Sequence, residues 1–171
     1  MAGSNYFKFF DKITVDGKLA TNIFRRFQFL RDNTINNRLF YEYQVKDGER
    51  PDILAHKYYG DSKYDWVILL FNNIYDPATQ WVMDTNEFNK FLIQKYGSLT
   101  SAFDTVHHYE NADGYIIDED TYNSLPVGSK SEVSVFEHES RLNEAKRDIK
   151  ILDSSYLLQV VRELKDGVSN G

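Results

Sequence analysis

The sequence predicts an α+β fold, and three patterns carry this prediction. Residues 41–45 alternate between apolar and polar side chains, which is the period of a half-buried strand. Residues 84–97 open with a capping-box pattern and place large apolar side chains on one helical face. Residues 105–118 hold two apolar stretches around a turn-forming segment, which indicates a β-hairpin. We expect three segments along the chain: an N-terminal arm and connecting segment over 1–40, a central βαα module with an added helix over 41–97, and a C-terminal α/β extension over 98–171.

The central module is marked by turn and helix signals in a specific order. Asp47-Gly48 ends the first strand, because glycine accepts the positive φ of a tight turn. Pro51 suits the first position of a helix, and Gly60 suits the left-handed position that ends one. The second helix, over residues 63–74, is apolar almost all round and too short to span a bilayer, so it belongs in a core or an interface.

The C-terminal half carries comparable signals. Asp84 to Glu87 form the capping box of a helix that Gly97 ends. The later elements are expected in this order: a short strand at Val133 and Val135, a charged helix over residues 137–146, a strand at Ile149 and Ile151, and a last helix capped by Asp153 and ended by Gly167.

Aromatic residues stand out in the composition, with 12 Tyr, 12 Phe and 2 Trp. Such side chains fill a protein's own core or anchor an interface. In the arm, residues 6–10 are apolar on both faces of an expected strand, which a terminal strand rarely buries on its own domain, so we expect this arm to dock on a partner. The predicted partner-binding residues are Tyr6, Phe7, Phe9, Phe10, Arg25, Arg26, Tyr59 and Trp81.

The connecting segment over residues 21–39 fits either a helix or a strand. Arg25, Arg26 and Arg31 form a small basic patch within it. Solvated charge is one interpretation of this patch, and docking on the carboxylates of an acidic partner is the other.

Sequence motifs of catalysis and metal binding are absent or weak. With no cysteine, the chain has no disulfide and no thiol nucleophile. It contains neither a Gly-x-Gly-x-x-Gly nor a Gly-x-Ser-x-Gly pattern. His107 and His108 precede Glu110, but neighbours on a strand point to opposite faces, so we expect local packing there and no metal site. Residues 118–120 are three successive acids, expected to be a solvated loop and not a glycosidase acid pair. The sequence predicts no enzyme, no cofactor and no metal.

Charge and hydropathy argue against two classes of partner, nucleic acids and membranes. The net charge of −6, from 26 acidic and 20 basic residues, disfavours nucleic acid as a partner. The first ten residues lack the apolar run of a signal peptide, and we expect neither a targeting segment nor membrane association.

The central module resembles the βαα portion of a LysM domain, a module that commonly binds glycans containing N-acetylglucosamine. The residues that carry this resemblance are Tyr43-x-Val45-Lys46-x-Gly48, Ile53-x-Ala55-x-x-x-Tyr59-Gly60, Trp66 and Asn72. The LysM pattern closes with a second strand, whereas this chain continues through Asp76-Pro77 into a further helix.

Over residues 5–165 the chain is similar to the LysM-like baseplate wedge protein of contractile-tailed bacteriophages. The ordered segments are Glu49-Arg50-Pro51, Tyr59-Gly60, Trp66 to Leu70, Lys95-Tyr96-Gly97, His107 to Glu110 and Asn143 to Leu152. This resemblance implies a non-enzymatic structural subunit of the virion tail baseplate, assembled in the host cytoplasm. Its implied partners are other wedge proteins and neighbouring copies of the wedge.

Two other functions stay open at this point. One is a glycan-binding LysM module linked to lytic machinery, which requires Tyr58, Tyr59, Trp66 or Trp81 to be exposed around a groove. The other is a hydrolase whose acid pair is hidden in the sequence.

Overall fold

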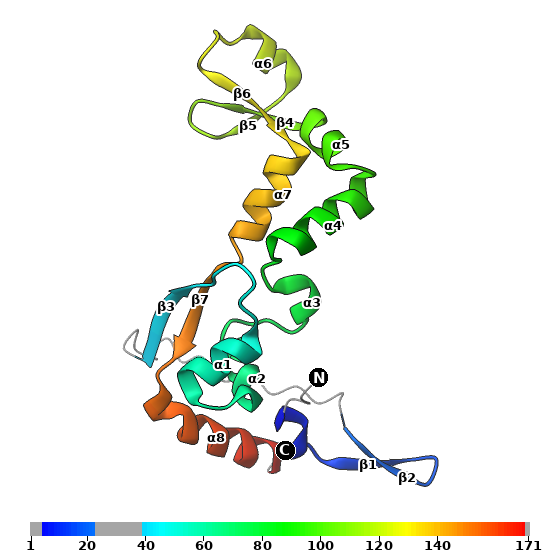
Figure 1. Cartoon of the computed structure of the whole chain (residues 1–171), viewed down its shortest axis with the longest axis vertical. Helices are drawn as coiled ribbons and strands as arrows, with labels where there is room; N and C mark the ends of the chain where they lie inside the picture. The colour runs from blue at the N-terminus through cyan, green and yellow to red at the C-terminus, as the bar shows by residue number, and fades with distance from the viewer. Residues whose placement is uncertain (1–4, 23–38, 170–171) are drawn as a thin grey trace. The chain divides into compact units, whose positions relative to one another are not determined.

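The computed structural model describes residues 5–22 and 39–169 and confirms an α+β protein. The chain forms two compact units (Figure 1). Unit 1 contains Met1–Trp81 together with Asp148–Gly171, and unit 2 contains Val82–Arg147. This division differs from the three successive segments expected from the sequence, because the last 24 or so residues return to pack with the first half of the chain.

Unit 1 is built around a two-stranded antiparallel sheet of β3 and β7. Its elements, in chain order, are η1 (Asn5–Phe9), β1 (Lys12–Val15), β2 (Lys18–Thr21), β3 (Phe40–Gln44), α1 (Pro51–Tyr59), η3 (Ser62–Tyr64), α2 (Asp65–Phe71), α3 (Pro77–Gln80), β7 (Asp148–Leu152), η4 (Ser154–Tyr156) and α8 (Leu157–Ser169). Strand β3 lies beside β7, with Phe40 opposite Leu152 and Gln44 opposite Asp148.

Local signals position α1 and α2 as the sequence predicts. Pro51 is the first residue of α1, and Gly60 ends it with a φ of 77° in the left-handed region. Asp61 then caps η3 by accepting a hydrogen bond from the Lys63 amide. Helix α2 buries Trp66, Val67, Ile68 and Phe71, which confirms its expected place in a core.

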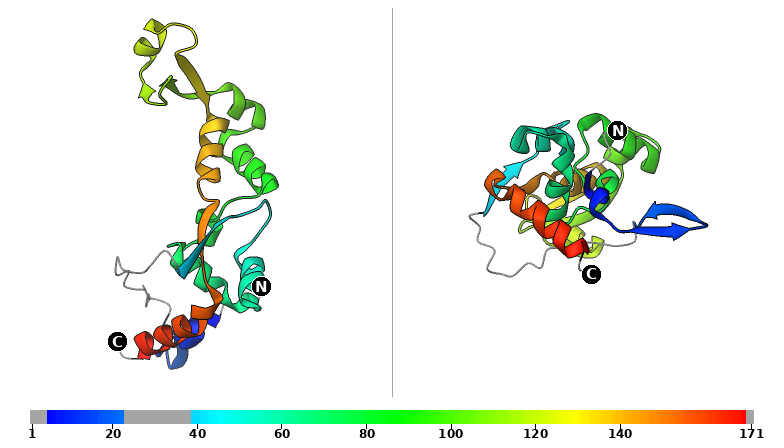
Figure 2. Two further views of the ribbon diagram at one scale, coloured as in Figure 1. Left: turned by 90° about the vertical axis from the view of Figure 1, so that its left-hand side faces the viewer. Right: turned by 90° about the horizontal axis from the view of Figure 1, so that it is seen from below.

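The core of unit 1 forms between α2 and α8, which lie side by side in Figures 1 and 2. Helix α8 contributes Leu157, Val160 and Leu164, three residues at helical spacing on one face. The helix runs to Ser169, past the expected end at Gly167. Phe10 from the N-terminal segment completes this core.

The sheet is tied to α2 by the side chain of Asn72. Its amide oxygen accepts from the Lys150 backbone N–H at 2.8 Å, and its Nδ2 donates to the Lys150 carbonyl at 2.7 Å. A side chain thus makes the two hydrogen bonds that a neighbouring strand would make, and this satisfies part of the edge of β7.

The N-terminal segment differs from the expected strand. Residues Asn5–Phe9 form the 3-10 helix η1, which turns Tyr6, Phe9 and Phe10 toward the core of unit 1. Phe10 is 4% exposed, whereas Phe7 is 45% exposed. The prediction of an extended arm with two apolar faces is therefore wrong, because a helical turn gathers on one side the aromatic residues that a strand would divide between two faces.

After η1, the strands β1 and β2 form a separate antiparallel hairpin that sequence reasoning missed. Asp16 and Gly17 connect them with φ angles of 49° and 73°. Positive φ at both central residues matches the twist of a two-residue hairpin, and Asp-Gly is a preferred pair for it. Most of the connecting segment after β2, including Arg25, Arg26 and Arg31, lies outside the described residues.

Unit 2 combines helices with a three-stranded sheet in the order β5-β4-β6. Its elements are α4 (Thr85–Tyr96), α5 (Leu99–Asp104), β4 (Val106–Asn111), β5 (Ile116–Ile117), α6 (Glu119–Ser124), β6 (Lys130–Ser134) and α7 (Val135–Glu144). The Asp84 cap and the hairpin of β4 and β5 confirm the sequence-based predictions. Val135 starts a helix and does not extend the strand, because Ser134 accepts from the Glu137 amide as an N-cap.

Unit 2 has a core of its own, formed by Phe88, Leu92, Ala102 and Val135. The Asn143 side chain holds the start of this unit, since it accepts from the Met83 N–H at 2.9 Å and donates to the Met83 carbonyl at 3.0 Å. Among the described residues, no helix combines the length and the apolar character needed to cross a membrane.

Candidate interaction surfaces

Most of the aromatic residues predicted to bind a partner pack inside unit 1. Tyr6 lies against Trp66, with ring centroids 5.7 Å apart, and Phe9 packs at the edge of the same core. Burial of Tyr59 raises the pKa of its hydroxyl, which fits a side chain held away from solvent. The Trp81 indole N–H donates to the Glu49 carbonyl at 2.9 Å and joins α3 to the start of α1. These side chains stabilise the unit itself, and their role toward a partner stays a prediction.

Phe7 is the predicted aromatic residue whose side chain is exposed, and it lies next to an exposed hairpin. Val15 is half-exposed, and Leu19 is 74% exposed at the hairpin of β1 and β2. Almost all residues of both strands are exposed. An isolated two-stranded hairpin is marginally stable in water, so this one is a candidate for ordering against another surface. The Asp16-Gly17 pair between alternating apolar residues is the sequence signal that identifies it.

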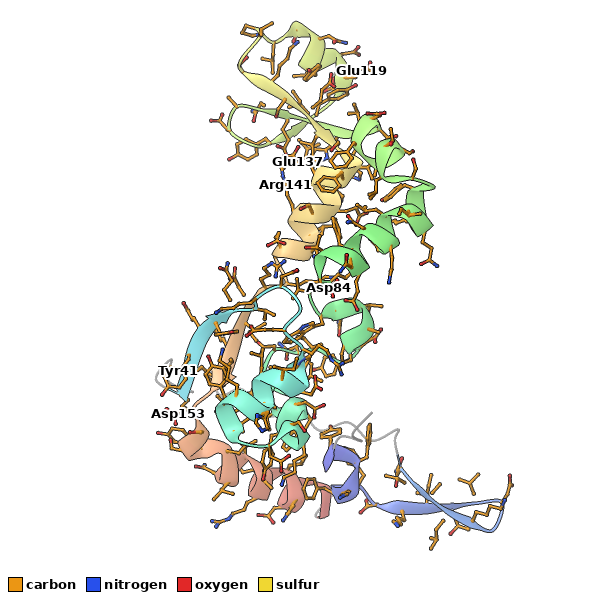
Figure 3. All side chains as sticks on the ribbon, viewed as in Figure 1. Tyr41, Asp84, Glu119, Glu137, Arg141 and Asp153 are labelled. Carbon is orange, nitrogen blue, oxygen red and sulfur yellow. The ribbon has the colours of Figure 1, made fainter. Side chains whose placement is uncertain are left out.

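A second exposed apolar surface lies on unit 2. Tyr115 and Ile116, at the turn between β4 and β5, each expose most of their side chains. Near α7, a depression of about 490 Å³ is lined by Phe103, Phe136 and Arg141 among others. Glu137 and Arg141, both labelled in Figure 3, also line this depression, and an ion pair of 2.6 Å joins them.

Buried carboxylates in unit 2 are held by ion pairs. The Glu139 carboxylate accepts from the Lys95 ammonium at 2.7 Å and from the Tyr96 hydroxyl at 2.6 Å. Burial opposes ionisation of Glu139, but the hydrogen bonds from Lys95 and Tyr96 outweigh it and lower the pKa. A carboxylate with a lowered pKa and two strong hydrogen bonds is suited to structure, whereas a general acid needs a raised pKa.

The acidic run over residues 118–120 also has a structural role. Asp118 caps α6 by accepting from the Thr121 amide at 2.9 Å and from its hydroxyl at 2.8 Å, which lowers the pKa of Asp118. Glu119 and Asp120 are exposed in the first turn of α6, where acidic side chains complement the helix dipole.

In unit 1, ionic groups fasten the sheet to the segments around it. The Tyr41 hydroxyl hydrogen-bonds the Asp153 carboxylate, and both side chains are labelled in Figure 3. The Glu49 carboxylate accepts from the Tyr43 hydroxyl at 2.6 Å and from the Lys46 amide at 2.9 Å. Although burial acts in the other direction, these hydrogen bonds lower the pKa of Glu49.

Three histidines meet between β4 and α7 of unit 2. The Nδ1 atoms of His107 and His108 lie 2.8 Å apart, and the ring of His138 stacks on His107 with centroids 3.7 Å apart. The expectation that neighbouring histidines on a strand point apart is wrong here, because the register of β4 against β6 shifts between Val106 and His108. A β-bulge at this place interrupts the alternation of side chains. Partial burial and the neighbouring histidine rings lower the pKa of His107.

Comparison with known proteins agrees with the resemblance seen in the sequence. Residues 5–124 match the family described as base plate wedge protein 53. The chain is also similar to the baseplate wedge protein gp53 of Enterobacteria phage T4, with 26% identity over 182 aligned residues that cover 92% of this chain and 93% of the relative. The family match takes in residues of both units and spans more than half of the chain. The chain therefore belongs to the base plate wedge protein 53 family.

Proposed function

We propose that this chain is a non-enzymatic structural subunit of the phage tail baseplate, which packs against other wedge proteins and helps fasten neighbouring wedges. The observation that carries the proposal is the family match over residues of both units. As a baseplate wedge protein, the chain is a component of the virion tail. The carboxylates of Asp118, Glu139 and Glu49 serve as caps and ion pairs, which supports a role without catalysis.

Within unit 1, we assign β3, α1, α2 and β7 to a LysM-like element. The sequence resemblance covers the first strand and the two helices, and β7 pairs antiparallel with β3 as a second strand would. The two strands are far apart in sequence because unit 2 is inserted between α3 and β7. In this proposal, the LysM-like element is a scaffold that carries an added unit.

Glycan binding finds no support in this scaffold. A sugar-binding groove needs exposed aromatic faces, but Trp66 is 4% exposed and Trp81 is 8% exposed. Tyr59 packs against the core formed by α2 and α8. Tyr58 is half-buried and lies edge-on to Tyr43. Of the four aromatic residues that glycan binding would use, Tyr59, Trp66 and Trp81 are therefore used for packing.

The hairpin of β1 and β2 is the best-supported contact to another baseplate protein. Its apolar residues Val15 and Leu19 are exposed, and its two strands form a sheet separate from β3 and β7. A partner that covers these residues removes apolar area from water and stabilises a hairpin that gains little from its own unit. Phe7, the exposed aromatic residue of η1, precedes the hairpin by a few positions in the sequence and is a further exposed apolar side chain of this N-terminal region.

A fastening role needs a contact on each of two neighbours. Unit 2 offers exposed Tyr115 and Ile116, while unit 1 offers the hairpin. The two surfaces belong to different compact units, each with a core of its own. A chain with two such contacts gains avidity when both are engaged, which is the property that a fastening subunit requires.

The test is incorporation into tail particles in cells infected by a phage that lacks this protein. Three forms are supplied in trans: the wild type, a hairpin variant with Val15→Thr and Leu19→Thr, and the control Leu158→Gln. Threonine keeps the β-propensity of the strands, and Leu158 is an exposed residue of α8 outside the hairpin. Lysates are separated by gradient sedimentation, and the chain is detected with an antibody.

We expect the wild type and Leu158→Gln to sediment with large particles, and the hairpin variant to stay in the light fractions. Equal incorporation of all three forms would contradict the role of the hairpin. Absence of the wild type itself from the particles would contradict the structural function.

A further inference from the structure

Three of the four histidines of the chain are gathered at one place in unit 2. His107 and His108 belong to β4, and His138 belongs to α7. One ligand atom from each lies within 4.8 Å of those of the other two. Imidazole nitrogens are the commonest metal ligands in proteins, and three that lie within this distance can reach one ion.

The β-bulge in β4 is what brings the two neighbouring histidines together. Val106 pairs with Ser134 and His108 pairs with Val133, so His107 is the additional residue on the bulged strand. On a regular strand the two rings would lie on opposite faces of the sheet. Bulges are frequent beside functional sites, where they redirect a side chain.

Hydrogen bonding fixes the tautomer of His108 in the form that a metal ion requires. Its Nε2 lies 3.0 Å from the Glu110 carboxylate, and a carboxylate can only accept, so Nε2 carries the proton. In the neutral ring with this tautomer, the Nδ1 atom of His108 carries the lone pair, and it lies 2.8 Å from Nδ1 of His107. Arg141 holds the same Glu110 oxygen at 2.6 Å and fixes the carboxylate in place. A carboxylate behind a ligating histidine is the usual outer partner of such a ligand.

The spacing of the nitrogen atoms also suits a small cation. Two nitrogens bound to one tetrahedral Zn²⁺, with Zn–N bonds of about 2.0–2.1 Å, lie about 3.3 Å apart. The two Nδ1 atoms are 2.8 Å apart, and all three ligand atoms lie within 4.8 Å. Without a metal, a proton must sit between the two Nδ1 atoms, and a cation would replace it. The rings of His107 and His138 are stacked with an interplanar angle of 9°, so one of them must tilt for both lone pairs to point at the ion.

From this geometry we infer that His107, His108 and His138 bind a divalent first-row transition-metal ion, with Zn²⁺ as the ion that fits best. Three imidazole nitrogens match the preferences of Zn²⁺, Cu²⁺ and Ni²⁺, and they leave one tetrahedral position for water or for another ligand. The ion would join β4 to α7 and thereby fasten the sheet of unit 2 to its last helix. This inference stands independently of the proposed role in the baseplate.

The test uses the full chain without an affinity tag, first treated with a chelator and then titrated with ZnSO₄ in a calorimeter. The wild type is compared with His138→Phe, which keeps a ring stacked on His107 but removes a ligand. A second variant, His107→Gln, also removes a ligand, and because His107 is exposed it tests the site even if His138→Phe does not fold. The control is His56→Ala, which removes the one histidine outside the cluster, an exposed residue of α1.

We expect one equivalent of Zn²⁺ to bind the wild type and the control with equal affinity, and at least tenfold weaker binding in both cluster variants. Replacing Zn²⁺ by Co²⁺ should give the visible absorption of a tetrahedral site in the wild type and not in the cluster variants. Absence of stoichiometric binding to the wild type, unchanged affinity in the correctly folded cluster variants, or loss of binding in His56→Ala would overturn the inference.

Discussion

Replacing Phe10 by alanine tests whether the N-terminal segment belongs to the core of unit 1. Phe10 is 4% exposed and packs with Trp66, Leu164 and other residues of the core. Removing a fully buried phenylalanine side chain costs about 3–5 kcal/mol, because apolar contacts are lost and a cavity remains. We expect a loss of about 3 kcal/mol, at the lower end of this range.

Phe7→Ala is the matched control, since Phe7 lies in the same short segment and is 45% exposed. Half-burial limits its contribution to about 1 kcal/mol. Both tryptophans of the chain belong to unit 1, so urea unfolding followed by tryptophan fluorescence reports on this unit. Equal stabilities of Phe10→Ala and the wild type would refute the assignment of Phe10 to the core, as would equal losses in the two variants.

Three further predictions concern the ionic network, a buried amide and the hairpin turn. Because the folded-state pKa of Glu49 lies below its ordinary value of 4.5, its carboxylate stabilises the fold above that pH, and this contribution is lost as the pH falls through the folded-state pKa. Glu49→Gln should therefore destabilise unit 1 at pH 7. In urea titrations, the difference in the free energy of unfolding between this variant and the wild type should shrink below pH 4.5. A difference that stays constant with pH would count against the hydrogen bond from Tyr43. Asn143→Ala should lower the stability of unit 2 by about 1–3 kcal/mol, because it leaves the backbone N–H and carbonyl of Met83 unpaired. Asn86 is exposed, so Asn86→Ala should change the stability by less than about 0.5 kcal/mol, and thermal melts followed by circular dichroism measure both variants. Gly17→Val should abolish the hairpin register, since valine disfavours a φ of 73°, and persistence of the cross-strand NMR contacts would contradict this.

Local signals allowed much of the secondary structure to be predicted. Asp84 and Gly97 bound α4 because a cap and a positive-φ glycine act within a few residues. Gly60 ends α1 for the same reason. The apolar character of α2 also predicted its burial correctly.

The pairing of strands that lie far apart in the sequence could not be predicted from local sequence patterns. Gln44 and Asp148 lie 104 positions apart, and nothing in either strand specifies the other as its neighbour. The return of residues 148–171 to unit 1 depends on this pairing and on the packing of α8, so the expected segment boundaries do not follow the compact units.

Two local features of the candidate sites were missed for different reasons. The Asp16-Gly17 turn was visible in the sequence, but the aromatic run before it was interpreted as an extended arm. The approach of His107 to His108 was not visible, because a bulge changes the direction of side chains without a distinctive residue pattern.

The most direct test of the central claim is to locate the chain in purified tail particles. Tails from infected cells are separated by gradient sedimentation at low and at high salt, and each fraction is probed with a specific antibody. A baseplate subunit held by buried apolar contacts should co-migrate with the particles at both salt concentrations, because salt screens charges but does not weaken apolar contacts. Recovery of the chain exclusively in the light fractions would contradict its assignment as a structural part of the baseplate.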